Sequence, residues 1–285
     1  MIVNGARRRC LRWIGAIGAT GAAAVCGAPL VASATPLARV RERGALAVGL
    51  YNDMPPFHAA GSGVDVELAR ALADALGVRL SLLPFNADDN MNDDLRNMVW
   101  RGHYLGYGPA DVLLHVPVDR PLMEHNPRVR IFAPYFRERV MIARSVERVP
   151  QLDTLSQLAG LPVAVSGQSL AGWLMLGADG GAYRSQLDTQ HKHGAQAAQA
   201  LVRGDAAAAV GLASELQSVL RGDARFALTP LPVPRAPRDG WAVGMAVKRD
   251  AAELAEALGQ AVQGLLAGGR LQQLFEGANV GWHAP

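Results

Sequence analysis

The sequence predicts an α/β fold, in which strands and helices alternate along the chain. Residues 46–50 form a short apolar run of strand length, and residues 78–83 form another. Between them, apolar residues recur at helical spacing from Val64 to Leu76, and Gly77 stands where a left-handed helix stop is expected. Two parallel strands joined by a helix form a right-handed crossover unit, so the chain opens as an α/β protein.

The loop after the first of these strands is a candidate binding edge. Residues 51–63 include two prolines and two glycines, so the loop continues neither a helix nor a strand. In parallel sheets, ligands bind at the carboxyl ends of the strands. We therefore expect ligand contacts from Asn52, Asp53, Met54 and Phe57.

The pattern of short strands and helices continues to the end of the chain. Strands are expected at residues 112–116, 163–165 and 240–247, and as an Ala/Val run that ends at Val210. Helices are expected around Leu95–Val99, from Ser169 onward, at residues 195–202 and at residues 269–275. A further helix is expected to be capped by Asp250, with Glu253 completing a capping box.

Residues 1–34 are expected to be a secretion signal peptide. Arg7, Arg8, Arg9 and Arg12 precede an apolar stretch at residues 13–28, and Ala32-Ser33-Ala34 fits a cleavage site. We therefore expect a periplasmic protein that begins at Thr35. The arginine run leaves the twin-arginine export route open. A lipid anchor on Cys26 is disfavoured, because Val25 stands where a small residue is needed.

The charge of the mature chain gives no support for a nucleic-acid or anionic-membrane partner. Four of the 28 basic residues and none of the 25 acidic residues lie in the expected leader, which leaves 24 basic against 25 acidic residues. Both cysteines, Cys10 and Cys26, are also in the leader. The mature chain can therefore form no disulfide and carry out no thiol catalysis.

The order of short motifs resembles the bacterial extracellular solute-binding proteins, family 3. The loop ends in P-P-F at Phe57, the first helix begins G-V-D-V-E-L-A at Gly63, and F-A-P-Y ends at Tyr135 before an apolar strand. The resemblance implies the two-lobed type II periplasmic-binding-protein architecture, with a ligand cleft between the lobes. It places lobe 1 at residues 35–137 and 238–285 and lobe 2 at residues 138–237.

One departure from the family pattern leaves a second function open. Residues 105–110 are extra, and Val116-Pro117 is similar to members that are encoded beside quinoprotein dehydrogenases. The resemblance therefore implies one of two partners. The first is an ABC transporter permease that receives a solute; the second is a periplasmic dehydrogenase that the protein serves as an accessory.

The resemblance also implies which residues hold the ligand. Gly167, Gln168 and Ser169 open a helix and suit an anion. Arg120 follows the strand at 112–116, near where the family carries a carboxylate-clamping arginine. His115 lines the cleft or is a core histidine; we take the cleft as the working prediction.

Gly211 points to the class of ligand. Amino-acid binders of the family carry an aspartate here for the α-ammonium group, and an aromatic residue often stands where this chain has Met54. A buried ammonium group without a carboxylate partner is costly. We therefore expect an anionic organic solute rather than a standard amino acid.

Catalysis, metal binding and cofactor binding are not expected. His191 and His193 lack supporting ligands at metal-site spacing. Some relatives of these binders are dehydratases or lyases, and an enzyme would need Glu215, Asp53 or His115 as its acid or base. Spacing shows no arrangement of these three residues. The prediction is a monomeric, non-enzymatic receptor for a small-molecule solute.

Overall fold

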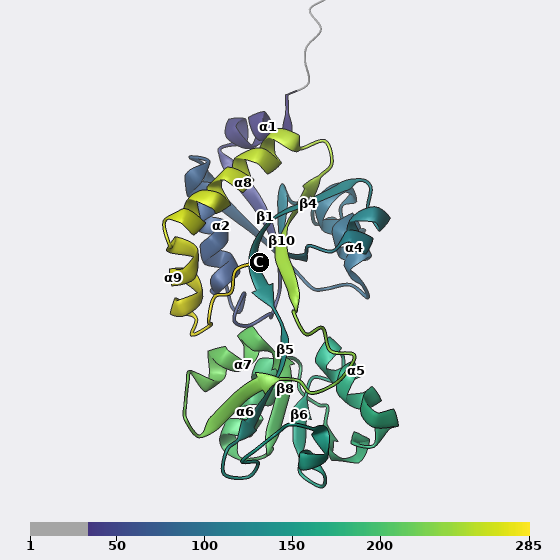
Figure 1. Ribbon diagram of the computed structural model, residues 1–285. Helices are drawn as coiled ribbons and strands as arrows, with labels where there is room; N and C mark the ends of the chain where they lie inside the picture. The colour runs from purple at the N-terminus through teal and green to yellow at the C-terminus, as the bar shows by residue number, and fades with distance from the viewer. Residues whose placement is uncertain (1–33) are drawn as a thin grey trace, which may run out of the picture. The chain divides into compact units, whose positions relative to one another are not determined.

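The computed structural model describes residues 34–285, so nearly all of the expected signal peptide lies outside the described residues. The strands form two five-stranded sheets (Figure 1). The first sheet has the order β2-β1-β3-β10-β4 and the second the order β7-β6-β8-β5-β9. No helix in this range is both long and apolar enough to cross a bilayer.

The first sheet contains the opening unit that the sequence predicts. β1 is parallel to β2 and β3, whereas β10 is antiparallel to both β3 and β4. The helix of the opening unit is α2 (Val64–Ala75), and Gly77 has a φ of +68°, as its expected role in stopping the helix requires. The strands are β1 (Ala45–Tyr51), β2 (Arg79–Phe85), β3 (Val112–Pro117), β4 (Val129–Glu138) and β10 (Trp241–Lys248).

Helices cover both faces of the first sheet (Figure 1). One face packs against α2 and three further helices, around a core that includes Leu46, Leu72 and Leu258. These three are α1 (Pro36–Arg43), α8 (Ala252–Ala267) and α9 (Arg270–Gly277). The other face packs against α3 (Met91–Leu95), the π-helix η1 (Arg96–Arg101) and α4 (Arg120–His125).

The second sheet lies within residues 140–230. Its strands are β5 (Val140–Ser145), β6 (Val163–Val165), β7 (Leu187–Asp188), β8 (Ala208–Leu212) and β9 (Phe226–Pro230). α5 (Leu170–Gly177) belongs to one core cluster, and α6 (Gly194–Arg203) and α7 (Ala213–Leu220) belong to another. Short 3-10 helices fill the connections: η2 (Leu155–Leu158), η3 (Ala178–Gly181) and η4 (Arg184–Gln186).

Two segments join the sheets. β4 ends at Glu138 and β5 begins at Val140, so Arg139 alone connects them. Residues 231–240, called here the crossing segment, lead from β9 back to β10 and contain three prolines. The lobe boundaries expected from the sequence stay a prediction.

The structure corrects two local predictions and adds two strands. α8 begins at Ala252 with Ala251 as its N-cap, so Asp250 and Glu253 form no capping box. Instead, the Asp250 carboxylate accepts a hydrogen bond from Lys248 (2.9 Å), and the Glu253 carboxylate accepts one from Thr35 (2.7 Å). The helix expected around Leu95–Val99 changes to π geometry at Arg96, and the sequence pattern did not predict β7 or β9.

Candidate functional site

The loop after β1 is held by bonds to neighbouring segments. The Asn52 amide N–H donates to the carbonyl of Phe85 (2.7 Å), and the Tyr51 hydroxyl donates to Asp94 (2.8 Å). The Met54 carbonyl accepts from the amides of Phe57 and His58, which closes the turn. Asp53 therefore sits at a fixed, exposed corner of this loop.

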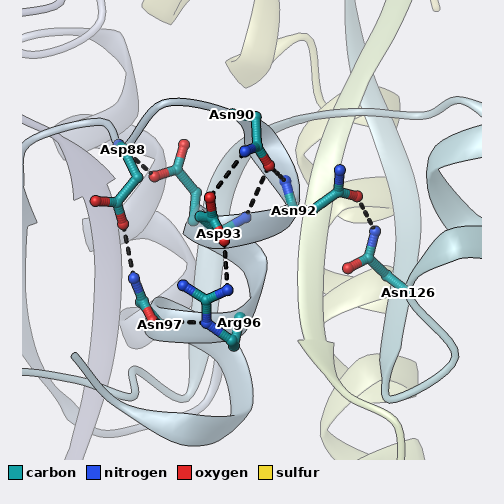
Figure 2. A network of polar contacts seen from close by, with 8 residues as sticks. Asp88, Asn90, Asn92, Asp93, Arg96, Asn97 and Asn126 are labelled. Carbon is teal, nitrogen blue, oxygen red and sulfur yellow. Dashed lines mark hydrogen bonds and ion pairs between the residues drawn. The ribbon is translucent and has the colours of Figure 1, made fainter. Parts of the chain in front are cut away.

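A polar network orders the turn between β2 and α3, beside this loop (Figure 2). Asn97 donates to Asp88 (2.6 Å), Asn90 donates to Asp93 (2.8 Å), and Asn126 donates to Asn92 (2.7 Å). Burial raises the pKa of Asp94 to about 6, against the hydrogen bonds from the Asp88 amide and the Tyr51 hydroxyl, which lower it. The network consists of neighbours of the candidate residues and includes none of them.

Phe57 and His115 lie in the core. Phe57 is 1% exposed, and its ring centroid is 4.1 Å from that of His115. The His115 ring nitrogen Nδ1 is 3.2 Å from the Asp65 carboxylate, and the Tyr135 hydroxyl donates to the other oxygen of Asp65 (3.2 Å). In this conformation neither Phe57 nor His115 presents its side chain to a solute.

Arg120 is the first residue of α4 and pairs within its own helix. Its Nε donates to Glu124 (2.7 Å), and its side chain is 88% exposed. Among the described residues Arg120 pairs with Glu124 and with no other candidate residue, so its role as a carboxylate clamp stays a prediction.

The Ser166–Ser169 turn is a capped helix start. Ser169 caps α5: its hydroxyl accepts from the Gly172 amide (3.1 Å) and donates to the Ser166 carbonyl (2.8 Å). A Cβ added to Gly167 would lie 3.0 Å from the Cβ of Thr189, so the close approach of these two backbones depends on glycine. Gln168 is exposed at the tip of the turn.

Lys192 brings the two candidate edges together. The Ser166 hydroxyl donates to the carbonyl of Lys192 (3.1 Å), which places this residue beside the Ser166–Ser169 turn. The Lys192 ammonium is 3.8 Å from the carboxylate of Asp53, in the loop after β1. Next to it, burial lowers the pKa of His193, although Asp53 opposes the shift. The sequence pattern gave no reason to select Lys192.

Glu215 fills the space at Gly211. A Cβ at Gly211 would lie 2.9 Å from the Cα of Gly194 and 3.2 Å from a Glu215 carboxylate oxygen. One Glu215 oxygen accepts from the Gly194 amide (3.0 Å), and the other accepts from the Leu212 amide (2.9 Å). Burial raises the pKa of Glu215 to about 7, which these two bonds oppose. No acidic side chain fits at position 211 beside this arrangement.

A second buried acid, Glu138, lies where β4 ends, and sequence reasoning missed it. It is fully buried; it accepts from the Ser214 hydroxyl and from the Arg139 amide (2.8 Å). Burial raises its pKa. A glutamate at the expected boundary between the lobes, between residues 137 and 138, was the available signal.

The fold is similar to that of solved solute-binding proteins. An ancestral cationic amino acid solute-binding protein matches with a TM-score of 0.65 and 20% identity, over 85% of this chain and 98% of that chain. An amino acid ABC transporter substrate-binding protein from Streptococcus pneumoniae, bound to L-arginine, matches with a TM-score of 0.61 and 20% identity, over 86% and 98%. A histidine kinase sensor domain with similarity to periplasmic binding proteins matches with a TM-score of 0.56 and 19% identity, over 85% and 98%.

No protein-family model matches the sequence, and no curated protein matches it. The structural matches confirm the predicted two-lobed α/β fold, because each spans nearly all of the matched chain.

Proposed function

We propose that this protein is a periplasmic, non-enzymatic receptor that binds a small organic acid and presents it to an ABC-type transporter. The observation that carries the proposal is the Asp53–Lys192 contact of 3.8 Å. It joins the loop after β1 to the segment beside the Ser166–Ser169 turn, the two edges at which the sequence predicts ligand contacts.

The anionic class of the ligand follows from the groups at these edges. Lys192 supplies an exposed cation, and the amide N–H groups at the start of α5 favour negative charge. Gly211 offers no carboxylate, and both oxygens of Glu215 already accept backbone hydrogen bonds. An organic acid therefore finds partners here, whereas an α-ammonium group lacks the acid that it would need at position 211.

The transport role is supported by the fold and by the expected leader. One matched structure is an ABC transporter substrate-binding protein, and the sequence of residues 1–34 fits export. Ligand binding by such a fold works through closure of the lobes, which the ligand favours to the extent that it binds the closed state more tightly.

A thermal-shift screen of organic acids and standard amino acids tests this proposal. A ligand at 100 times its dissociation constant adds about 2.7 kcal/mol to the free energy of unfolding, so a true ligand gives a clear shift. We expect a shift with an organic acid and its loss in Lys192→Ala. Lys248→Ala is the matched control, because Lys248 is the only other lysine and pairs with Asp250 (2.9 Å).

Arg120→Ala decides which cation holds the carboxylate. If the ligand-induced thermal shift is lost in Arg120→Ala and kept in Lys192→Ala, the carboxylate binds Arg120, as the sequence analysis expects. A shift with amino acids alone would contradict the anionic class.

A second candidate function rests on the extra residues 105–110. Leu105, the first residue of this segment, is 68% exposed, and Tyr104, directly before it, is 88% exposed. Exposed apolar side chains of this size favour a protein-docking surface, which fits an accessory protein of a quinoprotein dehydrogenase. Binding to such a dehydrogenase in size-exclusion chromatography, weakened in Leu105→Ser, would favour this function over transport.

A further inference from the structure

A hollow of about 600 Å³ lies between the crossing segment and the second sheet. Apolar side chains form most of its wall, among them Met141, Leu152, Leu231 and Val233. None of the residues that line it belongs to the candidate site around Lys192. The crossing segment passes α5 on its way to β10 (Figure 1).

Arg139 brings an unbalanced positive charge to this hollow. Its Nη2 lies 2.9 Å from Nε2 of His283, and its Nε is buried without a hydrogen-bond partner. Burial and the Arg139 charge lower the pKa of His283, so that ring is neutral and accepts from Arg139. Arg139 forms no ion pair among residues 34–285.

Two further polar groups line the same hollow without a partner of their own. The Thr229 hydroxyl is buried and has no hydrogen-bond partner, and the exposed Arg238 forms no ion pair within the described residues. The acid in the wall, Asp153, already accepts from Gln151 (2.7 Å). Buried polar groups in folded proteins nearly always have partners, so unpartnered groups beside a hollow call for an explanation.

We propose that this hollow binds a carboxylate with an apolar body, at a site separate from the Lys192 site. The carboxylate would lie between Arg139 and Arg238 and accept from the Thr229 hydroxyl, and the apolar body would pack on Leu152 and Leu231. The hollow is lined by two arginines and one aspartate, and the aspartate already accepts a hydrogen bond from Gln151, so the wall favours an anion. The apolar side chains of the wall disfavour small hydrophilic anions. Because Arg139 and the crossing segment are the two connections between the sheets, one ligand would contact both.

Calorimetric titration with sodium hexanoate tests the proposal. Hexanol supplies the same apolar body without the charge, and acetate supplies the charge without the apolar body. We expect saturable binding of hexanoate and at least tenfold weaker binding of both comparison compounds. We also expect Lys192→Ala to keep the hexanoate binding that the hollow provides. Arg139→Gln and Arg238→Gln should each weaken hexanoate binding at least tenfold. Arg235→Gln, an exposed arginine of the crossing segment outside this hollow, is the control.

The outcomes separate this site from the proposed function. If Arg139→Gln fails to fold by circular dichroism, Arg238→Gln and Thr229→Val carry the test. Hexanoate binding that disappears in Lys192→Ala and persists in Arg238→Gln and Thr229→Val would place the ligand at the Lys192 site and overturn the inference. Equal affinity for hexanol, or no saturable binding in any protein, would also overturn it.

Discussion

Glu215 and Asp53 are two acidic residues of the candidate site, and they differ in burial and in hydrogen-bond partners. Glu215 is held by backbone amides, whereas Asp53 is exposed to solvent. Both oxygens of Glu215 accept backbone amides, and burial raises its pKa to about 7. Asp53 is 58% exposed along its side chain and has the Lys192 ammonium at 3.8 Å as its partner. Glu215 is therefore engaged in the fold beside Gly211, whereas the Asp53 carboxylate and the Lys192 ammonium form an exposed pair that solvent reaches.

The largest expected effect comes from placing the family's aspartate at Gly211. Gly211→Asp would overlap Gly194 and bring a second carboxylate against Glu215, so we expect a loss of about 4 kcal/mol in the free energy of unfolding. Urea unfolding measures the change. Gly259→Asp is the control, because an added Cβ there meets no atom within 4 Å. Equal stability of Gly211→Asp and wild type would show that Glu215 does not occupy this space.

A somewhat smaller effect is expected from the protonation of Glu215. Its pKa is raised from 4.5 to about 7, so between these values the folded state binds more protons than the unfolded chain. The free energy of unfolding therefore falls as pH rises through this window, by about 3 kcal/mol at 1.36 kcal/mol per pKa unit. The stability that the Glu215 proton adds is fully present below pH 4.5 and is lost as pH rises through about 7.

Glu215→Gln removes this titration. Asp94, with a pKa of about 6, and Glu138, whose pKa burial also raises, lower the stability with rising pH in both proteins. The difference between the two pH profiles therefore reports the titration of Glu215 together with its coupling to Glu138. Urea unfolding of both proteins between about pH 4 and about pH 8 gives the profiles. Parallel profiles would contradict the raised pKa.

The smallest expected effect is that of Asp53→Ala. An exposed ion pair contributes about 0.5 kcal/mol or less, so the free energy of unfolding should hardly change. Thermal melting measures this directly. A loss above about 2 kcal/mol would mean that Asp53, like Glu215, maintains the fold, and the contrast between the two acids would fail.

Local patterns predicted the fold better than the site. The opening unit and β8 follow from apolar periodicity over neighbouring residues, and the structure has both. The Asp53–Lys192 contact joins residues far apart in the sequence, and no periodicity reports such a contact. Arg120 could have been judged differently from the sequence, because Glu124 follows it by four residues, the spacing of an ion pair on one helix.

The sequence shows that position 211 carries no acid, but it does not show why. The cause is the approach of Gly194 to Gly211, which leaves room for the Glu215 carboxylate alone. The predicted capping box of α8 is wrong for a similar reason: the Glu253 carboxylate accepts a hydrogen bond from Thr35, far away in the sequence, rather than from the start of its own helix. In both places, a contact between residues far apart in the sequence sets the local structure.

The position of β10 in the first sheet has a consequence for the order of folding. β10 lies between β3 and β4, next to the edge strand of that sheet, yet it is the last strand to be synthesised. All strands of the second sheet precede it as one continuous stretch. The second sheet can thus be complete while the first still lacks the strand that joins β4 to β3. The pairing of β4 with β10 must close a loop of roughly one hundred residues, which is a slow step. Until that step, the edges of β3 and β4 stay open to other chains, so a chaperone has most to protect in the first sheet.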